Sequence, residues 1–272
     1  MKTQFKMKRQ QRGFTLLEVA LVVVVMGVVL TSIMVARNQN ATRSTAAESA
    51  FMDTAVSSLF KFVKRNNRLP CPDSNGDGLE DANAGVCTSG ASTGGIPYLT
   101  LEMTLASPVG TGLDKQFVYG VYRGGNVSAK DLTLNEERSL PTPHVAPNAS
   151  YKNLDDFKQA LINAAAASQT VQPSNLYVTG NDTNSGASNC TDNKVANMAF
   201  VVAFAGARNA DEVGSDFDGP NLQGVGGWND GTKWASVANA TCFAGPGKSI
   251  TPLYDDQVRA VSFTELMGVL SR

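Results

Sequence analysis

One carboxylate stands alone in the most apolar part of the sequence. Residues 14–36 read FTLLEVALVVVVMGVVLTSIMVA, and Glu18 is the single ionisable side chain among them. A charged side chain at the centre of a membrane helix costs about 2.5–3.5 kcal/mol on insertion scales, and less near the interface. An ion pair tolerates such burial far better than a lone charge does. Glu18 therefore either snorkels to the lipid headgroups or meets a cationic partner.

A second set of oxygen-bearing side chains lies in the segment DSNGDGLED, residues 73–81. Its opening matches D-x-N-x-D-G, the start of a calcium-binding loop. The ligands in that interpretation are Asp73, Asn75, Asp77, the carbonyl of Leu79, and Asp81. The twelfth position, where a calcium loop carries a bidentate Glu, is Ala84. The alternative is a solvated turn of Asn, Gly and Asp, so the only cofactor that we predict is Ca²⁺, with no cofactor as the alternative.

The four cysteines form a third set: Cys71, Cys87, Cys190 and Cys242. All follow the apolar segment, and an even number in an exported chain favours disulfides. Four cysteines allow three connectivities, and proximity in the sequence favours Cys71–Cys87 and Cys190–Cys242. A zinc site is the weaker alternative, because no C-x₂-C spacing occurs and His144 is the single histidine.

Catalytic side chains are not evident in the sequence. With one histidine, no nucleophile has an evident base beside it. The adjacent acids Asp255 and Asp256 would point apart on a strand. Residues 245–249, GPGKS, resemble the end of a phosphate loop, but Cys242 occupies the position that requires the first glycine. We therefore predict that the chain is not an enzyme.

The distribution of charge assigns the termini to opposite sides of a membrane. Residues 1–13 carry five basic groups and no acid, which leaves 18 basic groups against 24 acidic ones in the remainder. An acidic body argues against binding nucleic acid. A helix over residues 14–36 would be about 35 Å long, enough to cross a bilayer. Because positive residues stay on the cytoplasmic side, residues 1–13 should be cytoplasmic and residues after about 37 outside.

The helical pattern continues beyond the apolar segment. Apolar residues recur every four positions at Ala47, Phe51, Ala55, Leu59 and Val63, which is typical of an amphipathic helix. Pro70 ends the pattern. We therefore predict one helix over residues 14–67, with a membrane-spanning first half and a second half that packs on a globular head.

The residues at this junction carry a resemblance. The segment KRQQRGFTLLE, residues 8–18, resembles the class III signal of type IV prepilins and type II secretion pseudopilins. In that family prepilin peptidase cuts after the glycine and N-methylates the new terminus. The resemblance implies cleavage after Gly13 and methylation of Phe14. It also implies that Glu18 pairs with the Phe14 ammonium of a neighbouring subunit and sets the register between helices.

Later segments support the same resemblance and give the fold of the head. The segment RLPCPD at residues 68–73 and the segment YDDQV at residues 254–258 are similar to parts of some larger pilin-like proteins. The sequence predicts a helix at Leu154–Ala167. Strands are predicted at Gln116–Arg123, Asn175–Thr179, Ala196–Phe204 and Val258–Phe263. Strands after one long helix indicate an α+β fold with an antiparallel sheet. The resemblance implies that this fold is pilin-like, with long disulfide-tied loops.

The domain organisation follows from these assignments. Residues 1–13 are the cleaved leader, residues 14–67 the helix and residues 68–272 a periplasmic or extracellular head. The resemblance implies a subunit of a type IV pilus or type II secretion pseudopilus, and the mature length of 259 residues, 272 less the 13 of the leader, favours a minor subunit. Its partners would be prepilin peptidase, other pilin or pseudopilin subunits and an inner-membrane assembly platform. The alternatives are a pilus-borne adhesin or uptake component, and a membrane-anchored hydrolase or sensor with an uncleaved N-terminus.

Overall fold

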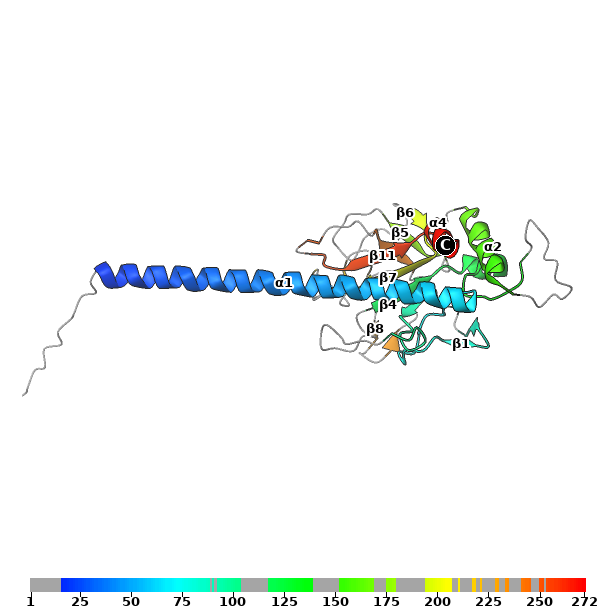
Figure 1. Ribbon diagram of the computed structural model, residues 1–272, viewed down its shortest axis with the longest axis horizontal. Coiled ribbons are helices and arrows are strands. Elements are labelled where there is room, and N and C mark those ends of the chain that lie inside the picture. The colour runs from blue at the N-terminus through cyan, green and yellow to red at the C-terminus, as the bar shows by residue number, and fades with distance from the viewer. Residues whose placement is uncertain are drawn as a thin grey trace, which may run out of the picture. The chain divides into compact units, whose positions relative to one another are not determined.

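The protein folds as a long helix followed by a mixed head (Figure 1). The computed structural model describes residues 16–88, 90, 92–103, 117–138, 152–168, 175–179, 194–206, 210, 217–218, 221, 228–229, 233–234, 241–245, 250–251 and 253–272. Side chains are described for these residues except 16–19, 30, 32–48, 126, 194–195, 228–229 and 233–234. The chain divides into two compact units, Met1–Ala47 and Glu48–Arg272.

The elements fall into three helices, two short 3₁₀ turns and eleven strands in the described residues. The helices are α1 (Leu16–Asn66), α2 (Leu154–Ala165) and α4 (Phe263–Leu270), with 3₁₀ turns at Gly124–Asn126 and Ser128–Lys130. The strands are β1 (Ala82–Asn83), β2 (Val86–Cys87), β3 (Thr93–Gly95), β4 (Phe117–Val121), β5 (Tyr177–Thr179), β6 (Lys194–Asn197), β7 (Phe200–Phe204), β8 (Trp228–Asn229), β9 (Lys233–Trp234), β10 (Cys242–Ala244) and β11 (Gln257–Val261).

The end of α1 lies one residue before the predicted end. Asn67 adopts a left-handed conformation, φ 53°, and its N–H donates to the carbonyl of Val63 at 2.9 Å. This is a common way to end a helix, because asparagine tolerates positive φ and the bond satisfies a terminal carbonyl. The stripe predicted from the sequence is confirmed in the head unit, where Ala55, Leu59 and Val63 are fully buried.

The main sheet has the strand order β11-β7-β4-β3, and every neighbouring pair is antiparallel. Residues of β4 alternate between two faces. On one face Phe117 stacks on Phe51 of α1, with ring centroids 4.1 Å apart. On the other face a Cβ at Gly120 would lie 2.6 Å from Leu176 and 3.2 Å from Phe243. The sheet is therefore covered on both sides, by α1 and by the segments around β5 and β10.

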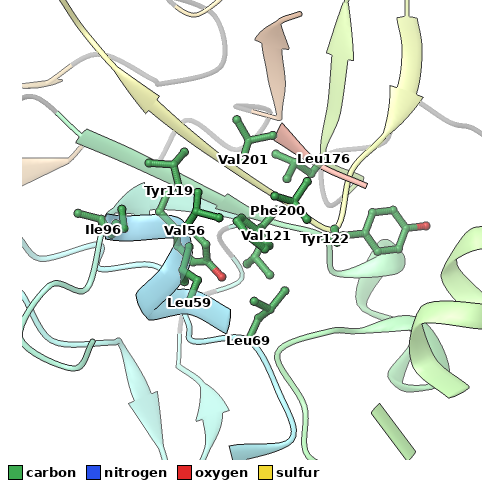
Figure 2. Close-up of a cluster of buried hydrophobic side chains, with 14 of the residues drawn as sticks. Val56, Leu59, Leu69, Ile96, Tyr119, Val121, Tyr122, Leu176, Phe200 and Val201 are labelled. Carbon is green, nitrogen blue, oxygen red and sulfur yellow. The ribbon is translucent and has the colours of Figure 1, made fainter. Parts of the chain in front are cut away.

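Burial on both faces explains the composition of the two central strands. All five residues of β4 and of β7 are buried, and such strands read as nearly continuous apolar runs. Figure 2 shows Val56 and Leu59 of α1 beside Tyr119 and Val121 of β4, with Phe200 of β7 in the same cluster. This core fixes the C-terminal part of α1 on the head.

The second sheet corrects two predictions. Its strand order is β10-β5-β6, and β10 pairs with β5 in parallel, so the head is not purely antiparallel. The predicted strand Ala196–Phe204 is two strands, because the chain changes sheets in the middle. The N–H of Met198 donates to Leu176 beside β5, whereas the N–H of Ala199 donates to Val261 of β11.

The predicted strand Val258–Phe263 also differs, since it ends at Val261 and a helix follows. Ser262 caps α4 by accepting from the N–H of Glu265 at 3.1 Å. The predicted helix Leu154–Ala167 is confirmed as α2, two residues shorter at its end. Asn153 and Asp156 form a reciprocal capping box at its start. The overall α+β class and the antiparallel main sheet therefore match the sequence prediction.

Candidate functional site

The assembly residues predicted from the sequence fall at the edge of the described chain. Gly13 and Phe14 lie outside the described residues. Glu18 lies in the first turn of α1, which begins at Leu16, and its side chain is not among those described. The pairing of Glu18 with a neighbouring Phe14 ammonium therefore stays a prediction.

The helix surface after Glu18 is apolar all round. Eight large apolar side chains between residues 21 and 29 are each 50–66 % exposed: Leu21, Val22, Val23, Val24, Val25, Met26, Val28 and Val29. Successive residues turn by about 100° around a helix, so six consecutive apolar residues cover its whole circumference. Thr31 does not interrupt this surface with a free hydroxyl, since its Oγ1 donates to the carbonyls of Gly27 and Val28. A surface of this kind is covered by lipid or by other helices in a working protein.

The predicted membrane span over residues 14–36 is not shown by the structure. Within the described parts of the chain, no helix meets the length and apolarity needed to cross a membrane.

The predicted disulfide between Cys71 and Cys87 is present, with its Cα atoms 5.5 Å apart. Cys242 of β10 is also disulfide-bonded, and its predicted partner Cys190 lies outside the described residues. His144 is outside them as well. The first disulfide loop is tied to the main sheet, because Asp73 and Gly95 of β3 exchange backbone hydrogen bonds of 3.0 and 2.7 Å.

The side chains predicted to bind calcium are engaged within their own loop. The carboxylate of Asp73 accepts from the N–H groups of Asn75, Gly76 and Gly78 at 2.7–3.1 Å. Burial raises the pKa of Asp73, and these three bonds oppose that rise. Asn75 Oδ1 accepts from the N–H of Asp77 at 2.9 Å.

The remaining loop carboxylates behave in the same way. Asp77 Oδ1 accepts from the N–H of Leu79 at 2.8 Å, and Asp81 Oδ2 accepts from the N–H of Ser74 at 2.7 Å and from its hydroxyl. Among the described residues, Asp73, Asp77 and Asp81 do not form a three-carboxylate group with oxygens within 4.8 Å of one another. The geometry is that of a self-capped turn, and calcium at this loop stays a prediction.

A buried ion pair that sequence reasoning missed joins the end of α1 to this loop. The two terminal guanidinium nitrogens of Arg68 donate to Glu80, at 2.7 and 2.6 Å, and the side chains are 9 % and 16 % exposed. Glu80 Oε2 also accepts from the N–H of Cys71 at 3.0 Å. The guanidinium lies 5.1 Å from the ring centre of Phe62. No local spacing rule links residues twelve positions apart in a loop, so the sequence carried no signal for this pair.

The prediction that Asp255 and Asp256 point apart is wrong. The two residues precede β11 and do not lie within a strand. One carboxylate oxygen from each lies within 4.8 Å of the other and of an oxygen of Asp218. We call Asp218, Asp255 and Asp256 the acidic cluster.

Comparison with known proteins identifies the N-terminal segment. Residues 8–34 match the family model described as the prokaryotic N-terminal methylation motif, the class III signal of type IV pilins and pseudopilins. No curated protein and no solved structure matches the chain. The motif supports a pilin- or pseudopilin-like protein, and it implies processing by prepilin peptidase and assembly with other pilin subunits.

Proposed function

We propose, from the methylation motif at residues 8–34, that this pilin-like chain is a minor structural subunit of a type IV pilus or type II secretion pseudopilus. Prepilin peptidase cuts after Gly13, and the mature chain is held in the inner membrane by the first part of α1 until it enters a filament. The observation that carries this proposal is the junction of the motif with the all-round apolar surface of α1.

The apolar surface supplies the cohesion. Each large apolar side chain contributes about 1.5–3 kcal/mol when it moves from full exposure to full burial. The side chains between residues 21 and 29 are at least half exposed, so most of that free energy is still to be gained by the isolated chain. Because the helix is apolar on all sides, it can be surrounded by lipid and later by several other helices.

Glu18 supplies the register. Cleavage after Gly13 creates a cationic α-amino group at Phe14, four residues before the carboxylate. In an apolar filament core neither charge is tolerated alone, whereas a pair between neighbouring subunits satisfies both. A sliding helix would separate the pair, so the pair selects one axial offset.

The length of the mature chain supports a minor role. The 272 residues less the 13 of the leader leave 259, which is long for a bulk subunit whose copies must stack along a filament. The alternative, a head that binds a surface ligand, stays a prediction.

The test is Glu18→Ala, expressed with the cognate assembly system. We expect normal cleavage and methylation but reduced incorporation into filaments, measured by immunoblotting of sheared filaments against the membrane fraction. Asp53→Ala is the matched control, because it removes an exposed carboxylate from the same helix. Incorporation of Glu18→Ala at the level of Asp53→Ala would contradict the proposed pairing.

A further inference from the structure

The acidic cluster has the spacing of a cation site. One oxygen from each of Asp218, Asp255 and Asp256 lies within 4.8 Å of the others. Two oxygens bound to one Ca²⁺ at about 2.4 Å are at most about 4.8 Å apart. Asp218 and Asp256 are buried, with 0 % and 3 % exposure, while Asp255 is half-buried. One ion could therefore contact all three carboxylates.

The fold assembles the cluster through backbone contacts. The pairing of Gln257 with Phe204 places Asp255 and Asp256 beside the end of β7. There Gly206 has φ +70°, and a Cβ on it would lie 2.5 Å from Asp255 Oδ1. The main-chain N–H of Asp255 donates to Asp218 Oδ2, and that of Asp218 donates to Asp256 Oδ2, both at 2.9 Å. The carboxylates are thus held together without a ligand.

The hydrogen bonds of Asp256 engage one of its two carboxylate oxygens. Asp256 Oδ2 accepts from Asp218 and also from Asn221 Nδ2 at 2.8 Å. Asp256 Oδ1 is buried and, among the residues that the structure describes, has no hydrogen-bond partner. The Asn221 amide cannot donate to this oxygen as well, because its second N–H donates to the Tyr254 hydroxyl at 3.2 Å. The amide oxygen of Asn221 accepts from the N–H of Ala244 at 2.7 Å. A buried neutral polar group without a hydrogen-bond partner costs about 1–3 kcal/mol, and a charged group costs more.

The electrostatics at Asp256 agree with a bound cation. Burial raises the pKa of Asp256 well above its usual range, and the charges of Asp218 and Asp255 add to that rise. The bonds from Asn221 and from the Asp218 N–H oppose it. In the described part of the chain, no lysine or arginine forms an ion pair with Asp256. A cation bound at Asp256 Oδ1 would offset the negative charge of this carboxylate.

We propose that the acidic cluster binds a calcium ion, with Asp256 Oδ1 as one ligand and oxygens of Asp218 and Asp255 as two others. The three side chains offer only oxygen, which suits a hard cation and not zinc. Calcium accepts irregular sets of six to eight oxygens, and water completes the shell, whereas magnesium demands a near-ideal octahedron. The ion joins the start of β11 to the segment around Asp218 and, through Asn221, to β10. This site is separate from the loop at residues 73–81.

The test measures Ca²⁺ binding to the full chain in detergent micelles by calorimetric titration, and thermal unfolding with CaCl₂ or EGTA. We expect one bound Ca²⁺ per chain, a higher Tm with CaCl₂, and little effect of Mg²⁺. Asp256→Asn and the half-buried Asp255→Asn should each weaken the Kd about tenfold or more, the range by which even outer residues of metal sites act. Asp77→Asn is the matched control at the other loop and should leave the Kd unchanged.

Two results overturn the proposal. One is an unaltered Tm and no heat of binding for the wild-type chain, which would leave a proton as the occupant. The other is binding that survives in Asp255→Asn but disappears in Asp77→Asn, which would assign the ion to residues 73–81. If Asp256→Asn does not fold, Asp255→Asn decides, since Asp255 is only half-buried. Processing at Gly13 is independent of both outcomes.

Discussion

Replacing Glu80 with Gln should destabilise the head more than any exposed charge change of the same kind. The substitution keeps the shape of the side chain and removes its charge. Arg68, which is 7 % exposed, then stays buried beside a neutral amide. One of its two short bonds, of 2.7 and 2.6 Å, loses its acceptor, because an amide offers one oxygen.

The expected loss is about 3 kcal/mol of unfolding free energy. Removing one partner of a buried ion pair typically costs about 3–5 kcal/mol, since the other charge remains buried without compensation. The lower end applies here because the amide oxygen still accepts one bond and because Glu80 is 16 % exposed. The N–H of Cys71, which donates to Glu80 at 3.0 Å, competes for that same oxygen.

The assay is urea unfolding of the full chain in micelles, followed by tryptophan fluorescence. Glu102→Gln is the matched control, because Glu102 pairs with Arg65 at 3.1 Å while both side chains are more than 60 % exposed. That exposed pair should contribute less than about 1 kcal/mol. In a double-mutant cycle, Arg68→Met combined with Glu80→Gln should cost less than the sum of the single changes. A loss for Glu80→Gln equal to that of Glu102→Gln would refute the reasoning.

Two other predictions concern the head. Changing Cys71 and Cys87 together to Ser should cost about 3 kcal/mol in the chain-entropy model, given their separation of 16 residues. The double variant is preferable to a reductant, which would also break the disulfide of Cys242; an unchanged urea midpoint would contradict the loop's role. Burial raises the pKa of Tyr177 to about 12 from 10.0, so the unfolded state ionises first and stability should fall as pH rises from about 10 to 12. Tyr177→Phe should flatten that fall in urea midpoints measured from pH 9 to 12, and an equal slope in both proteins would argue against it.

Features that depend on residues close together in the sequence could be predicted from it. Ala55, Leu59 and Val63 follow the four-residue spacing of a buried helix face, and all three are fully buried. The disulfide Cys71–Cys87 followed from closeness in the sequence. The helix α2 followed from acidic residues in its first turn, where Asp156 does cap the helix.

Features that depend on distant contacts were not predictable in this way. The break between β6 and β7 occurs where Met198 and Ala199 donate to different sheets, and the sequence shows one apolar run. The acidic cluster joins residues 37 and 38 positions apart, so its two halves look unrelated in the chain. For α4 a local signal did exist, since Ser262 stands three residues before Glu265 as in a capping motif.

The central claim is that the chain is a processed pilin-like subunit whose assembly helix begins at Phe14. Mass spectrometry of its N-terminal peptide, from cells that contain prepilin peptidase, tests this claim most directly. The account predicts a peptide that begins with N-methylated Phe14 and lacks the basic residues 1–13. A peptide that retains Met1 in the membrane-bound protein would contradict it.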